Sequence, residues 1–570
     1  MNRTDKTIKS RGIATVVLLL FNLCSLWLLS PAQAQPSWVK KATKSVFTLK
    51  TFAADGSLIA SSNGFFTGQN GEAVSSFSPF KGASRAIVID ANGKENAVES
   101  ILGANDIYDV ARFRVAGSKT QPLPLCTTTM PEGSTVWLLP YHETKHLYSG
   151  SILKAEKFMG NYDYYTVVLA SPQHVENCPL LNEAGEVIGL IQPSAVANDS
   201  LSYAISVIFA DSLRMNGFSI SEPVFQQTKI KKALPSDLKE ANVALFLASS
   251  KNDSLAYAEL VNDMISQFPA APDGYTYKAQ LSAGSGDFAS ADRYMAEAIH
   301  VSDPKDEAHY NFARLIYDKQ IYQPDVAYEP WTFDKALAEI REAIAIRQLP
   351  SYRQLEADIL FAQKHYDEAC DIYMQLAQTP MRSAELFYSA AKCKALQRDT
   401  TAMLALLDSC VGTFSKPYFK EAAPYLWERA EARRDAGKYR DAIADMNEYE
   451  KLMSAEVNES FYYIRHQTHI LARLYQQALN DINRAIQMNP KEVLYYAEKA
   501  SLEVRVGLYD DAIATSKECI AVDPNASDGY LFLGLAQCLK NNKKEGIENL
   551  RKAKEFGDPQ ADALIEKYSK

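Results

Sequence analysis

The C-terminal part of the chain repeats the same small residues at a constant interval. Ala478, Ala512 and Gly546 lie 34 residues apart. The same interval separates a second set of small residues and a pair of prolines, namely Ala485, Cys519, Ala553 and Pro490, Pro524. A fixed period means that one structural unit recurs, and a unit of this size buries its apolar face only against its neighbours. The period therefore restricts this region to a stack of similar units.

Residues 236–570 predict helices throughout. They are rich in Ala, Leu, Glu, Lys and Tyr, and their apolar residues recur with a period of about 3.6. Further copies of the unit start near residues 286, 333, 365, 437 and 507. The pattern resembles the tetratricopeptide repeat (TPR). This resemblance implies an all-α TPR superhelix of about eight or nine helix pairs, with an insertion at 320–331 and a capping segment at 561–570.

The first helix of each repeat would line the concave face of such a superhelix. Chaperone-binding TPR domains carry a Lys/Asn clamp for a carboxylate at these positions, and the clamp is missing here. The aligned positions hold Trp427, Glu431, Arg434, Tyr463, Gln467, Ile470, Leu494, Ala497 and Ser501. Aromatic and polar groups suit an extended or helical protein segment, so Arg434, Tyr463 and Gln467 are the candidate binding residues. The alternative is that some of them pack between helices.

Residues 38–215 have a different character. Short runs of β-branched and aromatic residues predict strands at 45–52, 86–90, 134–139 and 164–169. Asp-Gly and Asn-Gly pairs at 55–56, 70–71 and 92–93 predict hairpin turns. Many short strands with frequent turns indicate a sandwich or a barrel.

Several blocks of this region resemble HtrA/trypsin-like serine proteases, in the order of that family. They are residues 64–67 (GFFT), 71–83 (GEAVSSFSPFKGA), 108–115 (YDVARFRV), 179–190 (PLLNEAGEVIGL) and 201–213 (LSYAISVIFADSL). The resemblance implies the all-β double β-barrel of the trypsin class.

The catalytic residues of that family are not matched. The chemistry needs a His that takes the proton from Ser, an Asp that orients the His, and backbone N–H groups for the oxyanion. Ser78 stands at the His position, Glu176 at the nucleophile position and His174 at the oxyanion glycine. Only Asp109 is retained. The resemblance therefore implies a pseudoprotease without catalytic residues.

Three alternatives remain open from the residues. Cys178 could be a displaced nucleophile with His174 as its base. Residues 142–146 (HETKH) match the zinc motif HExxH, which needs a helix to bring both His together, whereas Pro140 and the flanking strands predict a loop. Finally, the inactive cleft could bind peptides as a regulator, with Glu176 meeting them directly.

The cysteines give no sign of a disulfide scaffold or a zinc site. Beyond residue 34 there are seven, and they are scattered, with no CxxC pair. A bridge between Cys126 and Cys178 stays open. No cofactor and no metal ion are expected.

Residues 1–34 predict a signal peptide. Arg3, Lys6, Lys9 and Arg11 precede an apolar run, and Ala32-Gln33-Ala34 matches a cleavage site. Cleavage after Ala34 would leave no transmembrane helix, and the alternative is an uncleaved anchor. Together with an HtrA-like domain, the signal indicates export to the periplasm, envelope or exterior of a Gram-negative bacterium.

A chain of 570 residues is too long for one core, and its net charge of −9 excludes a basic footprint for nucleic acid. The sequence predicts a signal peptide at 1–34, a trypsin-like double β-barrel at 38–215, a linker at 216–235 and a TPR domain at 236–570. The predicted function is an exported non-catalytic scaffold whose repeat groove binds protein or peptide partners.

Overall fold

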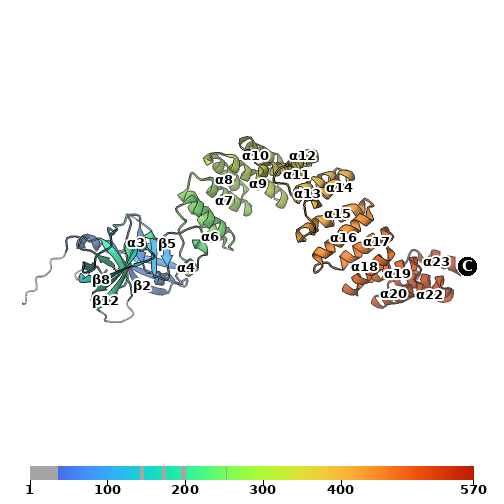
Figure 1. Ribbon diagram of the computed structural model, residues 1–570, viewed down its shortest axis with the longest axis horizontal. Coiled ribbons are helices and arrows are strands. Elements are labelled where there is room, and N and C mark those ends of the chain that lie inside the picture. The colour runs from blue at the N-terminus through green and yellow to red at the C-terminus, as the bar shows by residue number, and fades with distance from the viewer. Residues whose placement is uncertain (1–35, 118, 142–146, 170–174, 194–199, 252) are drawn as a thin grey trace, which may run out of the picture. The chain divides into compact units, whose positions relative to one another are not determined.

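The computed structural model describes residues 36–117, 119–141, 147–169, 175–193, 200–251 and 253–570. The chain divides into two compact units. The first is Met1–Gly284 with Ser290–Val301, and the second is Ser285–Ala289 with Ser302–Lys570. All strands of the described residues belong to the first unit, drawn from blue to green in Figure 1.

The first barrel is a closed antiparallel sheet with the strand order β1-β2-β3-β6-β5-β4. Its strands are β1 (Val46–Phe52), β2 (Leu58–Phe66), β3 (Glu72–Ser75), β4 (Arg85–Ile89), β5 (Glu95–Asn105) and β6 (Val110–Val115). Large aromatic side chains fill its interior. The ring centroids of Phe47 and Phe66 are 4.9 Å apart, and those of Phe80 and Phe113 are 5.2 Å apart.

The second barrel is closed in the same way, with the order β10-β11-β12-β9-β8-β7. Its strands are β7 (Thr135–Leu138), β8 (Tyr148–Phe158), β9 (Tyr162–Val168), β10 (Pro179–Leu181), β11 (Val187–Ile191) and β12 (Leu201–Ser206). The predicted double β-barrel is thereby confirmed. The four expected strands are β1, β4, β7 and β9, with ends that differ by at most two residues.

A shared apolar cluster joins the two barrels. It contains Val46 and Val110 of the first barrel and Leu181 of the second. The short helix α2 (Val39–Ala42) adds to this cluster. Trp38, just before α2, covers the turn at Gly185, where a Cβ atom would lie 2.5 Å from the indole and where φ is +80°. The turn at residues 181–185 (LNEAG) therefore needs glycine at 185 for two reasons: the backbone is left-handed there, and the Trp38 ring leaves no space for a Cβ atom.

The segment treated above as a linker is packed against the first barrel. It contains η2 (Ser219–Ser221) and α4 (Pro223–Gln226), and it follows α3 (Val207–Ser212). Val224, Phe225 and Ile230 belong to the core cluster of the first barrel, and Lys232 pairs with Ile101 of β5 in a parallel bridge. Residues 216–235 are therefore part of the barrel's packing.

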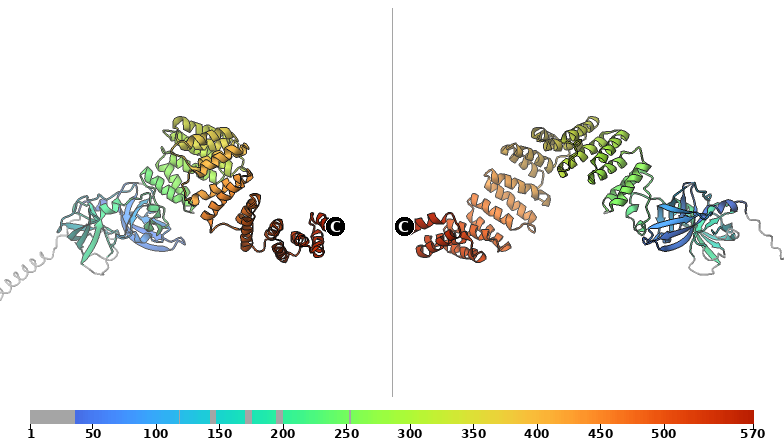
Figure 2. Two further views of the ribbon diagram at one scale, coloured as in Figure 1. Left: turned by 45° about the vertical axis from the view of Figure 1, so that its right-hand side comes forward. Right: turned by 180° about the vertical axis from the view of Figure 1, so that it is seen from behind.

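Nineteen helices follow within the described residues, and the first eighteen are grouped in nine pairs by chain order. Figure 2 shows the helices of the second unit stacked one against the next. The pairs up to residue 301 are α5 (Leu238–Ser249) with α6 (Ser254–Gln267), and α7 (Pro272–Gly284) with α8 (Phe288–Val301). The later ones are α9 (Asp306–Tyr322) with α10 (Phe333–Ile346), α11 (Pro350–Ala362) with α12 (Tyr366–Leu376), α13 (Ala384–Leu396) with α14 (Thr400–Val411), α15 (Ala423–Asp435) with α16 (Tyr439–Met453), α17 (Glu459–Leu471) with α18 (Tyr475–Met488), α19 (Val493–Arg505) with α20 (Tyr509–Val522), and α21 (Ser527–Leu539) with α22 (Lys543–Glu555). A short η3 (Lys420–Ala422) precedes α15, and α23 (Ala561–Ser569) ends the stack.

The small residues of the 34-residue period lie where helices approach most closely. Ala478 and Ala512 are fully buried. At Gly546 a Cβ atom would lie 2.4 Å from Cys538 Sγ and 2.7 Å from the Gly534 carbonyl oxygen. The period thus marks contacts at which any larger side chain would push the helices apart.

The expected insertion is a long connection between α9 and α10. Trp331 anchors it, with 1% of its surface exposed. Its ring packs 5.4 Å from Phe288 and 6.0 Å from Phe312, all within the second unit. The connection therefore adds to the helical core.

Candidate functional site

Ser78 and Asp109 lie next to each other where the protease family has its His and Asp. Ser78 begins the 3-10 turn η1 (Ser78–Phe80), just after β3, and Asp109 precedes β6. The backbone N–H and the hydroxyl of Ser78 both donate to Asp109 Oδ1, at 2.6 Å and 2.7 Å. The Asp109 carbonyl accepts from Phe77 N–H at 3.3 Å. The two positions aligned by sequence are thus neighbours in space.

This pair lacks a base for acyl transfer. A serine hydroxyl has no nitrogen lone pair that takes up a proton near neutral pH, and here its own proton points to a carboxylate. Asp109 is bound by a hydroxyl and an amide in place of an imidazole. The arrangement ties η1 to the start of β6, which is a structural role.

The segment at the nucleophile position is held by hydrogen bonds across the two barrels. Asn177 has φ of +66°, a left-handed conformation that Asn tolerates better than most residues. Its buried side-chain amide donates to Ser62 Oγ at 2.8 Å and to Ser76 Oγ at 2.9 Å. The carbonyl of the preceding Glu176 accepts from Asn63 Nδ2 at 3.2 Å. These hydrogen bonds hold the backbone of Glu176 beside the first barrel, and its side chain is partly exposed.

Cys178 is unsuited to be a displaced nucleophile. Only 1% of its surface is exposed, and it belongs to the apolar core of the second barrel. Burial raises the pKa of its thiol to about 12, so the reactive thiolate is scarce at neutral pH. Cys126 lies in the same core, and both are free thiols. The Cys126–Cys178 disulfide that the sequence left open is therefore not formed. The burial of Cys178 and the raised pKa of its thiol both argue against a role as a displaced nucleophile.

Some predicted features lie outside the described residues. These are the signal peptide at 1–34, the HETKH segment at 142–146 and His174. Within the described residues, no three His, Cys, Asp or Glu side chains come together as a metal site. The helices of that same part of the chain include none with the length and apolarity needed to span a bilayer.

The candidate binding residues of the repeats lie on α15 and α17. Tyr463 Oη donates to Glu498 Oε1 at 3.4 Å, and its ring centroid is 5.3 Å from that of Tyr495 on α19. Burial and the nearby Glu498 raise the pKa of Tyr463. Arg434 and Gln467 are each partly exposed, and Arg434 Nε lies 3.5 Å from its neighbour Asp435. Tyr463 thus helps to join two repeats, while Arg434 and Gln467 remain partly exposed.

A row of tyrosine and glutamate side chains on the first helices was not predicted. Tyr425 Oη donates to Glu385 Oε2 at 3.0 Å, and its ring lies 5.7 Å from Tyr388. Burial, together with Glu428, raises the pKa of Tyr388 to about 12. The signal in the sequence is a three-residue spacing of Tyr and Glu, at 385–388, 425–428 and 495–498, which puts both on one helix face. Glu385 and Glu428 are exposed, so this row carries negative charge beside aromatic rings.

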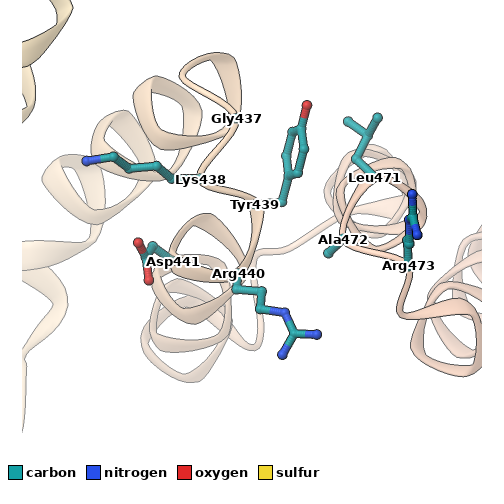
Figure 3. A pocket seen from close by; sticks show the side chains of 8 residues that line it. All are labelled: Gly437, Lys438, Tyr439, Arg440, Asp441, Leu471, Ala472 and Arg473. Carbon is teal, nitrogen blue, oxygen red and sulfur yellow. The ribbon is translucent and has the colours of Figure 1, made fainter.

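A shallow hollow of about 440 Å³ lies between the turns of two neighbouring repeats. Residues 437–441 and 471–473 line it (Figure 3). Tyr439 and Leu471 point to one side, and Arg440 extends to the other (Figure 3). The residues lie at the ends of helices rather than on the first-helix faces, so the hollow is separate from the candidate binding residues.

The sequence matches curated proteins only in part, and no family model matches it. The small glutamine-rich tetratricopeptide repeat-containing protein 2 of Saccharomyces cerevisiae is 30% identical over 95 residues, which are 16% of this chain and 28% of that protein. The Hsp70-Hsp90 organizing protein of Triticum aestivum is 22% identical over 249 residues, 42% of this chain and 41% of that protein. The chain thus spans about a quarter to two fifths of the length of these relatives. The yeast protein is named as a tetratricopeptide repeat-containing protein, which is the repeat that the 34-residue period predicted. The TPR resemblance is thereby confirmed.

Two solved structures similar to part of the chain are described as proteases. The active form of a protease from M. tuberculosis has a TM-score of 0.28 at 16% identity, covering 32% of this chain and 85% of that structure. A serine endoprotease from Yersinia pestis has a TM-score of 0.27 at 18% identity, covering 30% and 62%. The double β-barrel itself is assigned from the strand order given above.

Proposed function

We propose that the chain is an exported, non-catalytic scaffold in which the double β-barrel is kept as a fold and the helical repeats bind a protein or peptide. The observation that carries this proposal is the hydrogen-bonded pair Ser78–Asp109. Ser78 donates to the Asp109 carboxylate at 2.7 Å, so among the described residues neither aligned position supplies the imidazole that takes the nucleophile's proton in this family.

The nucleophile position supports the same conclusion. The Glu176 carboxylate cannot replace an activated hydroxyl in amide hydrolysis. The nearest thiol, Cys178, is enclosed in the barrel core. At the aligned positions among the described residues, the imidazole base and the hydroxyl nucleophile are thus lacking together.

The repeats supply the binding surface in this proposal. Stacked helix pairs present extended faces that suit protein segments. Exposed Glu385 and Glu428 beside Tyr388 and Tyr425 favour a partner segment with basic and apolar side chains. One relative is named as an organizing protein for Hsp70 and Hsp90, which agrees with a protein-binding role for this type of repeat.

Export is proposed from the sequence of residues 1–34. The basic start, the apolar run and Ala32-Gln33-Ala34 are features of a secretory signal. The proposed location is the periplasm or the outer envelope of a Gram-negative bacterium.

Crosslinking with the full-length purified chain tests the binding role. We expect the chain to capture a defined envelope protein, and Arg434→Ala and Gln467→Ala to reduce that capture at least severalfold. Glu368→Ala is the matched control, because Glu368 is an exposed residue of α12, a second helix. Equal capture by all variants would place the binding surface elsewhere, and no capture by the intact chain would contradict the proposal.

A further inference from the structure

A cavity of about 570 Å³ lies in the first unit, where the packed segment after the barrel meets α5 and α6. Phe225 and Ile230 line it from the barrel side, and Tyr257 and Leu260 line it from α6. Its volume falls within the range of roughly 300–1,000 Å³ that is usual for small-molecule sites. None of the residues discussed for the protease or repeat sites belongs to it.

Two lysine ammonium groups at this cavity are held only by neutral oxygen atoms. Lys251 Nζ donates to the Ile220 carbonyl at 2.6 Å, and Lys232 Nζ donates to the Thr228 carbonyl. Within the described part of the chain, neither ammonium group forms an ion pair with a carboxylate. By contrast, the neighbouring Lys231 is paired with Asp263 at 2.7 Å. Lys232 and Lys251 thus have no counter-charge of their own at the cavity, and Lys229, a further lysine of its lining, is exposed.

The positive charge of Lys232 is also partly removed from water, whereas Lys251 is exposed. Burial, and then the charge of Lys251, lower the pKa of Lys232. An anion between the two ammonium groups would relieve both effects and gain charge-assisted hydrogen bonds. Two carboxylates also line the cavity: Asp253, which caps α6 by accepting from Ala256 N–H at 3.0 Å, and exposed Glu259. The negative charge of Asp253 and Glu259 would repel an anion, and it would repel a doubly charged anion such as phosphate more than one with a single charge.

We propose that this cavity binds a ligand with one carboxylate on an apolar body. The carboxylate lies between Lys232 and Lys251, and the apolar body packs on Phe225, Ile230 and Leu260. Two sources carry this chemistry: the C-terminal end of a polypeptide with apolar last residues, and a free medium-chain fatty acid. The site is separate from the repeat face and goes beyond the scaffold role.

Titration calorimetry with the full chain tests the proposal with three probes. They are N-acetyl-leucyl-phenylalanine as the free acid, the same dipeptide as its C-terminal amide, and octanoate. We expect the free acid or octanoate to bind, and the free acid to bind roughly tenfold more tightly than the amide if a polypeptide end is the source. Binding of octanoate alone would identify the free acid as the source.

Lysine variants connect the binding to this cavity. Lys251→Gln should weaken carboxylate binding roughly tenfold, and Lys232→Gln should do the same provided that its circular dichroism matches the parent chain. Lys239→Gln is the matched control, an exposed lysine of α5 that does not line the cavity. The proposal is overturned if no probe binds, if acid and amide bind equally and octanoate does not bind, or if Lys251→Gln behaves like Lys239→Gln.

Discussion

The side chain and the backbone of Ser78 both donate hydrogen bonds to a single oxygen of Asp109, Oδ1, at 2.7 Å and 2.6 Å. In the protease family the corresponding positions hold a His and the Asp that orients it. Here the same proximity fixes the turn η1 against the start of β6. The pair thus has a structural role in this fold.

Removing these hydrogen bonds should lower stability in a fixed order. Ser78→Ala removes the hydroxyl bond and keeps the backbone bond, so we expect a loss of about 1 kcal/mol. Asp109→Ala removes both acceptor contacts and should cost more, about 2–3 kcal/mol. Urea unfolding followed by tryptophan fluorescence measures both losses. A larger loss for Ser78→Ala than for Asp109→Ala would contradict the account.

The Cys178 thiol should resist alkylation in the folded chain. With 1% of its surface exposed and a pKa raised to about 12 by burial, it offers almost no thiolate at pH 8. Mass spectrometry after iodoacetamide treatment should find Cys178 unmodified in the native chain and modified in urea. Rapid native labelling would restore Cys178 as a candidate nucleophile.

Acid should destabilise the α17–α18 pair. His466 Nδ1 lies 2.9 Å from the Ala478 carbonyl oxygen, and His469 Nε2 lies 3.3 Å from Asp481 Oδ2. Burial lowers the pKa of both imidazoles. Below about pH 6.5 the unfolded chain therefore binds protons that the folded chain excludes, so this part of the stability is present at higher pH and is lost as the pH falls.

The pH dependence of the melting temperature checks this sign. Between pH 7.5 and pH 5 the melting temperature should fall, and His466→Gln or His469→Gln should make the fall smaller. His365→Gln, a change at the exposed histidine that directly precedes α12, should leave the slope as it is. An identical slope in all four proteins would show that the buried imidazoles do not contribute.

Adding one methyl group at Gly546 should destabilise the last repeats. Alanine favours a helix over glycine by up to about 1 kcal/mol, but its Cβ would lie 2.4 Å from Cys538 Sγ. We expect a net loss of about 1–3 kcal/mol by thermal unfolding. Gly284→Ala is the control, because Gly284 ends α7 with open space around it. If Gly546→Ala stabilised the chain as Gly284→Ala should, the small-residue contact would not be tight.

Local and periodic features were predictable from the sequence. The block at 71–83 assigned Ser78 to the His position of the family and the block at 108–115 assigned Asp109 to its Asp position, and the structure brings these two residues into contact. The 34-residue period placed Gly546 at a close helix contact, because one unit geometry recurs along the stack.

Contacts without a local pattern were not predictable. Polar residues 226–229 separate Ile230 from Val224 and Phe225, so the segment looked like a linker, whereas the structure packs all three apolar residues into the first barrel. Tyr463 was correctly placed on a first helix, but its partner Glu498 lies in the next repeat. A periodic pattern predicts on which face of a helix a residue lies, but it does not predict which residue of the next repeat contacts that face.

Incubation of the purified chain with unfolded casein tests the central claim most directly. We expect no casein fragments, with or without a zinc chelator, and the same result for Cys178→Ala. Casein cleavage that disappears on Cys178→Ala, or on addition of the chelator, would contradict the account and assign the chain an active hydrolytic centre.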